Sequence, residues 1–95
     1  MTYTYYVYLV TNNHNSVLYT GVTNDLKRRV FEHREGRCGN FTSRYKVRKL
    51  VYYEITTAIE SALAREKQIK AGSRQKKLNL IEAFNPDWDD LYDEI

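Results

Sequence analysis

The segment LYTGVTNDLKRRVFEH, Leu18–His33, changes its hydrophobic pattern near its middle and thereby decides much of the fold. Apolar and β-branched residues at its start predict a strand over Val17–Val22, whereas the later apolar residues recur at helical spacing. That spacing predicts a helix from about Asp25 to Glu35, with Thr23 or Asn24 as its N-cap. The segment therefore supplies one strand and one helix of the expected fold.

The helix in this segment places charged residues at its core-facing side. Leu26, Val30 and His33 form the inward face, and Arg29 borders it. An arginine suits a phosphate or a carboxylate, and a histidine can bind a phosphate, donate a proton or ligate a metal. The alternative is a hydrogen-bonded core histidine beside a snorkelling arginine. Because both residues occur on one face, a site is favoured.

The whole chain predicts one α+β domain over 1–95, with elements in the order ββαβαα. The first strand lacks alternation, as expected of a central strand covered on both faces. The polar run Thr11–Ser16 joins the first two strands as an antiparallel hairpin, and Thr57 with Glu60 has the spacing of a capping box. We therefore expect a three-stranded antiparallel sheet packed with helices. The expected elements are strands Tyr3–Val10, Val17–Val22 and Leu50–Ile55, helices Asp25–Glu35, Thr57–Ala71 and Ser73–Phe84, and a basic loop from Gly36 to Arg48.

The C-terminal segment 85–95 has a different composition from the rest of the chain. It carries five acids and no base, whereas residues 1–84 carry 15 bases and seven acids. Asn85 and Pro86 mark both a helix stop and a new helix start. Trp88, Leu91 and Ile95, together with Tyr92, share one helical face, so this acidic segment is expected to dock as a helix.

The net charge of +3 hides a concentrated basic region. Between Val22 and Leu50 there are nine bases and three acids. Such a surface attracts phosphate backbones, although a solvated charged face is the ordinary alternative. The apolar run Tyr5–Val10 is too short to span a membrane, and no secretory signal is evident. With Cys38 as the single cysteine, a reducing, cytoplasmic location is expected.

The helix after the third strand contains a misplaced carboxylate. Helical spacing puts Ile59, Ala62, Leu63, Glu66 and Lys70 on one face, so Glu66 falls within an apolar stripe. A carboxylate in the interior costs several kcal/mol unless it is paired or bound to a metal. One alternative is an ion pair with Lys70, one turn later. The position on the apolar face favours a site.

Two tyrosines of the predicted hairpin complete the set of candidate residues. Tyr8 and Tyr19 lie on separate strands and can point at the same helix face. Their rings are ordinary core material, but their hydroxyls need partners and can serve in acid–base chemistry. Gly21 leaves room for close approach. Together with Arg29, His33 and the carboxylate of the later helix, these residues indicate metal-assisted phosphodiester chemistry.

On these residues the chain resembles the GIY-YIG nucleases, which are named for two short tyrosine motifs on a hairpin. The motifs correspond here to YVY, Tyr6–Tyr8, and YTG, Tyr19–Gly21, with Tyr6 and Thr20 as departures that spare the motif tyrosines. The spacing of the family pattern then falls on Arg29, His33 and Glu66. The resemblance covers nearly the whole chain and is closest to the small stand-alone bacterial members.

The resemblance implies a nuclease that uses one divalent cation, Mg²⁺ or Mn²⁺, held by Glu66. It implies that Tyr8 or Tyr19 activates water, that Arg29 stabilises charge on the phosphate, and that His33 orients a phenol or contacts phosphate. The family's late asparagine corresponds to Asn79 or Asn85. The implied substrate is DNA, with branched or damaged structures in repair or recombination as one expectation. The residues expected to contact the nucleic acid are Lys27, Arg28, Arg44, Lys46 and Lys70.

Two other classes of function stay open from the sequence. One is a nucleic-acid-binding module of the same fold with weak or no catalysis. The other is an interaction adaptor that uses the acidic segment Trp88–Ile95, and a protein partner that supplies targeting is compatible with each class. Geometry discriminates them, because a nuclease requires the candidate residues to converge on one concave basic surface. A Glu66 that pairs with Lys70 on the outside would count against the nuclease.

Overall fold

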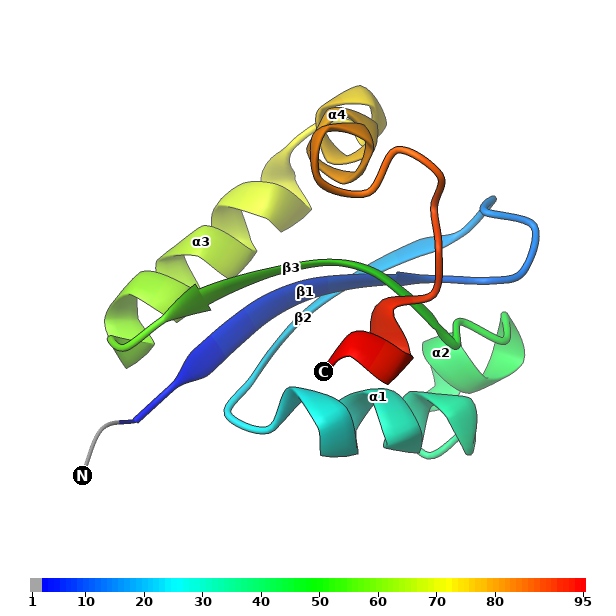
Figure 1. Ribbon diagram of the computed structural model, residues 1–95, viewed down its shortest axis with the longest axis horizontal. Coiled ribbons are helices and arrows are strands. Elements are labelled where there is room, and N and C mark those ends of the chain that lie inside the picture. Colours follow the sequence, from blue (N-terminus) through cyan, green and yellow to red (C-terminus); the bar gives the residue numbers. More distant parts are fainter. Residues whose placement is uncertain (1–2) are drawn as a thin grey trace.

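The computed structural model describes residues 3–95 and has a three-stranded antiparallel sheet at its centre, with strand order β2-β1-β3 (Figure 1). The central strand β1 (Tyr5–Thr11) pairs with both β2 (Leu18–Thr23) and β3 (Lys49–Thr56). The last five residues of β1 are all buried, as expected of a strand covered on both faces. The predicted fold class, a hairpin plus a third strand packed with helices, is confirmed.

Helices cover both faces of this sheet. Figure 1 shows α3 and α4 above it and α1 below it, with α2 following α1. A short 3₁₀ turn, η1, lies near the C-terminus on the same side as α1. None of the helices within residues 3–95 is both long and apolar enough to cross a membrane. The helical elements are α1 (Leu26–Arg34), α2 (Asn40–Arg44), α3 (Ile59–Ala71), α4 (Arg74–Phe84) and η1 (Leu91–Glu94).

Side chains of β1 alternate between two hydrophobic cores. Val7 and Leu9 pack in the core formed with α3 and α4, whereas Tyr8 and Val10 pack in the core formed with α1 and η1. Successive strand residues point to opposite faces of a sheet, so neighbours in sequence enter different cores. This alternation sends the ring of Tyr8 to the side of the sheet that α1 covers.

The hairpin between β1 and β2 forms through the side chain of Asn12. Its Oδ1 accepts hydrogen bonds from the backbone amides of Ser16 and Val17, at 2.8 and 3.2 Å. Asn15 has φ 56°, in the left-handed region that asparagine tolerates. The predicted turn chemistry is confirmed, while the strands begin and end one or two residues later than predicted.

The predicted N-caps of α1 and α3 are wrong, whereas Ser73 caps α4 as predicted, its hydroxyl accepting from the amide of Lys76. Asp25 caps α1, because its carboxylate accepts from the amide of Arg28, whereas Thr23 accepts from the amide of Asp25 in the preceding turn. The predicted capping box of Thr57 does not form. Ala58 occupies the N-cap of α3, and its amide donates to the hydroxyl of Thr56. Several short polar residues lie near the start of each helix, and the path of the backbone decides which residue occupies the N-cap.

The predicted core face of α3 is rotated from the observed one. Ala62 and Ile69 are buried, but Ile59 and Leu63 keep 38% and 45% of their surface exposed. The buried pair lies seven residues apart, and of the apolar residues that precede Glu66 on its predicted face only Ala62 is buried. The sequence suggested that Glu66 interrupts the core. In the structure it lies instead at the border between core and solvent.

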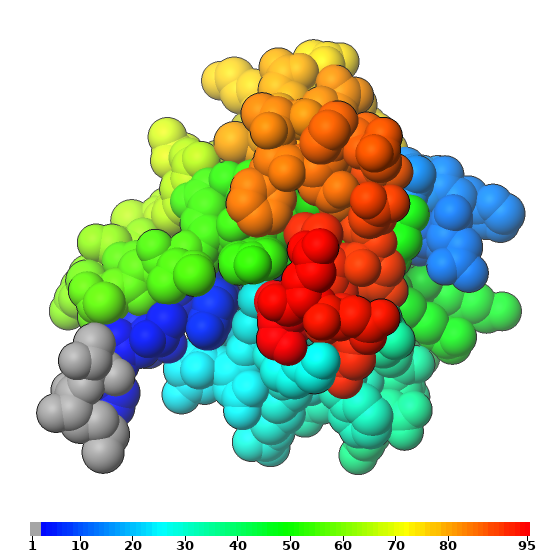
Figure 2. Space-filling model, in the orientation of Figure 1, coloured from blue at the N-terminus to red at the C-terminus, as the bar shows by residue number. Residues whose placement is uncertain are grey.

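The C-terminal segment docks without the predicted helix. Only η1 is helical there, since Trp88 adopts φ 54° and breaks any continuous helix after Pro86. Leu91 is buried and packs in the core between the sheet and α1. Figure 2 shows this segment, in red, running down from α4 and covering part of the face next to α1. The short helix α2 is a further difference, because it lies in the region predicted as a basic loop.

Candidate active site

Gly21 leaves room for the ring of Tyr8 to lie over the edge strand β2. The two residues are opposite each other in the register of β1 and β2, and Tyr8 is fully buried. A Cβ added at Gly21 would lie 2.8 Å from Cε1 of Tyr8 and closer still to the hydroxyl. Only glycine leaves space for the phenol ring at this point of the strand.

His33 is the hydrogen-bond partner that receives the Tyr8 hydroxyl. Nε2 of His33 lies 2.9 Å from Oη of Tyr8, and both residues are almost completely buried. Burial, and then the nearby charge of Arg29, lower the pKa of His33 to about 4, so the imidazole is neutral at physiological pH. Nδ1 of His33 is buried and has no hydrogen-bond partner within residues 3–95. One ring nitrogen is therefore committed to Tyr8, and the other stays free.

Arg29 places a permanent positive charge beside this pair. Burial raises the pKa of Tyr8 well above that of an ordinary phenol, and the guanidinium of Arg29 only partly offsets this. Arg29 also forms an ion pair with Glu32, with Nε 3.4 Å from Oε1. Its side chain interacts with the buried phenol of Tyr8 and is also partly exposed, so it remains accessible to an anion from solvent.

Tyr19 brings a second phenol to the same place from the edge strand β2. Its ring centroid lies 5.5 Å from that of His33 in an edge-to-face arrangement. Nζ of Lys70, on α3, lies 5.9 Å from the centroid of the Tyr19 ring. Tyr19 is only partly buried, in contrast to Tyr8. Of the two phenols, Tyr19 is the one open to water.

Glu66 on α3 is connected to this edge of the sheet through Lys70. Its side chain keeps only 17% of its surface exposed, and Oε1 pairs with Nζ of Lys70 at 3.5 Å. The expected ion pair thus exists, but Lys70 also lies over the ring of Tyr19, so the pair borders the cluster. The candidate residues Tyr8, Tyr19, Arg29 and His33 therefore gather at the β2 edge of the sheet, and Glu66 approaches them from α3 through its ion pair with Lys70.

The donor set at this edge fits a hard cation held by a single carboxylate. Glu66 supplies oxygen ligands of the kind that Mg²⁺ and Mn²⁺ prefer, and Mg²⁺ usually keeps several waters. Within residues 3–95 there is no group of three or more His, Cys, Asp or Glu side chains that could hold a metal. Lys70 is half exposed, and a lysine side chain has a flexible stem, so a cation can replace its ammonium at the carboxylate. The residues fit a weak, one-carboxylate site that is completed by substrate phosphate.

The five residues expected to contact nucleic acid fall into different surroundings. Lys70 lies at the cluster, and the guanidinium of Arg44 lies 5.6 Å from the ring of Tyr45 in the α2 region. Lys46 follows with φ 54° on the exposed surface. Arg28 pairs with Glu32 across one turn of α1. Lys27 is engaged by the C-terminal segment, because its Nζ donates to the carbonyl of Tyr92 and lies over that ring.

Neither candidate asparagine joins the cluster. Asn85 is buried near β3, the opposite edge strand from β2, where its Nδ2 donates to the carbonyls of Val51 and Asp89. Its Oδ1 accepts from the amide of Asp89, so the polar atoms of the side chain serve the turn after α4 and its attachment to β3. Asn79 is exposed on α4 and accepts from Gln75.

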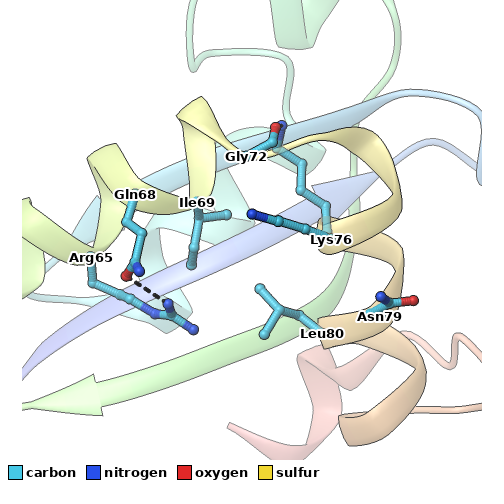
Figure 3. A pocket seen from close by; sticks show the side chains of 8 residues that line it. Arg65, Gln68, Ile69, Gly72, Lys76, Asn79 and Leu80 are labelled. Carbon is cyan, nitrogen blue, oxygen red and sulfur yellow. Dashed lines mark hydrogen bonds between the residues drawn. The ribbon is translucent and has the colours of Figure 1, made fainter.

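Asn79 also lines a groove between α3 and α4 (Figure 3). Side chains of Ile69 and Leu80 form its floor, and Arg65, Gln68 and Lys76 surround it. Arg65 is already bound to Glu54, with Nε and Nη2 both donating to the carboxylate. This groove is lined by different residues from the tyrosine–histidine cluster, and it contains none of the five residues that gather there.

Sequence reasoning overlooked one neighbour of the cluster. Phe41 of α2 lies with its ring centroid 6.3 Å from Tyr19. Its position in a predicted loop gave no reason to place it near β2. The available signal was the spacing of Phe41 and Tyr45, which lie one helical turn apart among basic residues.

Comparisons with known proteins agree with this geometry. A family model described as the GIY-YIG catalytic domain matches residues 4–79, a range that includes all five residues of the cluster. A UPF0213 protein of Staphylococcus saprophyticus is 40% identical over 77 residues, which cover 81% of this chain and 93% of that protein. A UPF0213 protein of Haloquadratum walsbyi is 41% identical over 78 residues, covering 82% and 86%. The solution NMR structure of a UPF0213 protein from Bacillus halodurans aligns with a TM-score of 0.58 at 29% identity, over 92% of each chain.

Proposed function

Because the chain belongs to the GIY-YIG catalytic domain family, we propose that it is a metal-dependent DNA endonuclease that hydrolyses phosphodiester bonds. Membership implies a nuclease with a nucleic-acid substrate, and nucleases of this family generally depend on a divalent metal. We also propose that the enzyme is selective for branched or damaged DNA and acts in repair or recombination. The observation that supports it best is the buried hydrogen bond of Tyr8 to His33 beside Arg29.

The two tyrosines have different roles in this proposal. Tyr8 is buried, its raised pKa keeps it a neutral phenol, and its bond to the neutral His33 fixes both rings. Tyr8 and His33 are therefore assigned to position Arg29 and the second phenol. Tyr19 is open to water and orients the water that attacks phosphorus in line with the leaving oxygen.

Arg29 and Glu66 act on charge. The Arg29 guanidinium stabilises the negative charge that builds on the non-bridging phosphate oxygens, in a partly buried position where electrostatic interactions are stronger than in water. Glu66 is the residue that would hold one Mg²⁺ or Mn²⁺, which supplies Lewis-acid charge for the phosphate and the leaving oxygen when bound. Lys70 leaves the carboxylate and turns to the DNA backbone.

A cleavage assay with a matched variant on the same helix tests this proposal. The purified protein is incubated with plasmid, single-stranded, duplex and branched DNA in Mg²⁺, Mn²⁺ or EDTA. Glu66→Gln should lose at least about 100-fold of the rate, because a metal contributes several kcal/mol to the transition state. Glu60→Gln changes an exposed carboxylate in the first turn of α3 and should cleave like the wild type.

The tyrosine assignment has its own pair of variants. Tyr19→Phe should abolish cleavage and leave stability nearly unchanged, whereas Tyr8→Phe should also destabilise the fold by about 1–3 kcal/mol, because it leaves His33 without its partner. A folded protein that cleaves none of these substrates with either metal contradicts the nuclease proposal. Equal rates for Glu66→Gln and Glu60→Gln contradict the metal assignment.

The runner-up is a nucleic-acid-binding module that has kept the fold without turnover. The observation that favours it is the ion pair of Glu66 with Lys70, which neutralises the one carboxylate of the cluster available to a metal. Such a module would bind DNA with a steep salt dependence that survives Glu66→Ala, and no cleavage would accompany the binding. A protein partner that supplies targeting is compatible with either function.

A further inference from the structure

Two exposed aromatic side chains extend the cluster beyond Tyr19. Phe41 in α2 and Tyr45 at its C-terminal end keep 48% and 43% of their surface in solvent. The ring centroid of Phe41 lies 6.3 Å from Tyr19 on one side and 4.9 Å from Tyr45 on the other. The three rings form a continuous row, which we call the aromatic row, from the candidate active site into solvent.

The backbone beneath the aromatic row is anchored. Thr42, between the two exposed rings, is buried, and its hydroxyl donates to the carbonyl of Cys38 at 3.1 Å. The carbonyl of Thr42 accepts from the amide of Val47 at 3.0 Å, and Val47 is fully buried. These contacts point Thr42 inward, so the rings of Phe41 and Tyr45 are held on the outer side of α2. Single exposed apolar side chains are ordinary, but contiguous exposed rings mark an interaction site, so this row points to a ligand.

Charge at the aromatic row selects the class of ligand. Residues 36–53 carry five bases and no acid. The guanidinium of Arg44 lies 5.6 Å from the centroid of Tyr45, and Lys46 is exposed in the next turn. Neither base takes part in the ion pairs found within residues 3–95. Aromatic rings interleaved with basic side chains that form no ion pair favour a nucleic-acid strand over an apolar protein partner.

We propose that Phe41 and Tyr45 form a stacking subsite for an unpaired nucleobase, adjacent to the phosphate bound at Tyr19 and Arg29. The inference rests on the proposed nuclease function and names its substrate class as DNA with unpaired nucleotides at the cleavage position. Arg44 and Lys46 hold the phosphates on either side of the stacked base.

The reason for unpaired substrate is geometric. In a duplex both faces of each base are covered by the neighbouring base pairs, so an aromatic ring has no face to stack on. An unpaired base offers a free face, and stacking on an aromatic side chain tolerates every base. The aromatic row thus confers preference for single-stranded over duplex DNA without reading sequence.

The test measures binding separately from cleavage. A short single strand with 2-aminopurine at successive positions, and the blunt duplex of the same sequence, are titrated in EDTA and followed by 2-aminopurine fluorescence and anisotropy. The variants are Phe41→Leu, which keeps apolar volume without a ring, and Phe41→Trp, which restores a ring. Phe31→Leu is the matched control, since Phe31 on α1 is 44% exposed and has the guanidinium of Arg37 5.8 Å from its centroid.

The expected result is single-strand affinity reduced by about 5- to 150-fold in Phe41→Leu, as the loss of one stacked base implies. Phe41→Trp should bind like the wild type, duplex affinity should hardly change, and Phe31→Leu should have no effect. At one position of the strand, fluorescence should be quenched in the wild type and released in Phe41→Leu. Circular dichroism establishes that each variant is folded.

Unchanged single-strand affinity in Phe41→Leu overturns the subsite, as does an equal loss for single strand and duplex. Cleavage in Mg²⁺ is measured in parallel and has separate consequences. Loss of single-strand binding in Phe41→Leu without any cleavage by the wild type supports the subsite and refutes the nuclease. Cleavage of single strand and duplex at equal rates, unaffected by Phe41→Leu, supports the nuclease and refutes the subsite.

Discussion

Lowering the pH from 8 to 5 should destabilise the protein through His33. Burial, and next the charge of Arg29, lower the pKa of His33 to about 4, whereas an unfolded histidine titrates near 6.5. As the pH falls through about 6.5, the unfolded chain binds a proton that the folded protein does not bind. The stability associated with neutral His33 is therefore fully present above about pH 6.5 and is lost as the pH falls towards 4.

The magnitude of this loss follows from the two pKa values. At pH 5 nearly all unfolded chains carry the proton and about a tenth of the folded ones do, so the free energy of unfolding decreases by roughly 2 kcal/mol relative to pH 8. At pH 4 the decrease reaches about 3 kcal/mol. With a urea m-value of about 1–2 kcal/mol per M, the loss at pH 5 moves the unfolding midpoint by about 1–2 M.

Urea unfolding at pH 8, 6 and 5 tests this expectation with two variants. The chain has two histidines, so His14→Gln is a control for the exposed one and should show the wild-type loss. His33→Gln removes the buried titration and should lose about 2 kcal/mol less than the wild type between pH 8 and 5. Carboxylates contribute little in this window, because their unfolded pKa values lie near 4. Wild type and His33→Gln losing the same stability would refute the argument that burial holds His33 neutral.

Three further changes have expected outcomes that urea unfolding measures. Gly21→Ala should lower the free energy of unfolding by about 1–3 kcal/mol, because its Cβ would overlap the buried ring of Tyr8. The control Gly72→Ala should lower it less, because the tightest contact of its Cβ is a backbone oxygen at 3.3 Å. Equal losses of stability in the two variants would contradict the close packing at Gly21. Asn85→Ala should cost about 1–3 kcal/mol, because three backbone groups lose their buried partner, yet cleavage by the folded fraction should be unchanged; loss of cleavage would give Asn85 a role in the site. Asp90→Ala should cost about 1–2 kcal/mol, and less in 1 M salt, because the carboxylate accepts from two backbone amides and a guanidinium; a salt-independent loss would indicate that the charge is unimportant.

Local sequence patterns located the regular elements but not all of their boundaries. The uninterrupted apolar run of β1 and the helical spacing of α1 and α4 predicted the correct element types, because each burial pattern depends on residues that are close in sequence. The helix α2 was missed, since five residues give too little periodicity and its stability comes from the buried contacts of Thr42 and Val47. The α3 face was misplaced, because several rotations of that helix bury similar numbers of apolar residues.

Among the candidate site residues, the sequence identified the types of side chain better than their surroundings. Both readings of Glu66 turned out to describe one arrangement, since the residue pairs with Lys70 and still borders the cluster. The roles of Tyr8, Tyr19, Arg29, His33 and Glu66 stay predictions. Phe41 could not be assigned from sequence, because its contact with Tyr19 joins an unpredicted helix to an edge strand.

The sequence by itself determined the fold class and the hairpin and supplied the candidate residues for phosphodiester chemistry, because strand and helix periodicity and motif spacing are local properties. Only the tertiary structure decided which of these residues meet. Tyr8 reaches His33, 25 positions away, because the register of β1 and β2 places Gly21 beneath its ring and the packing of α1 places the imidazole beyond it. Register and helix packing depend on the whole core, and for that reason the segment Leu18–His33 contains Gly21 and His33 but does not determine their contacts with Tyr8.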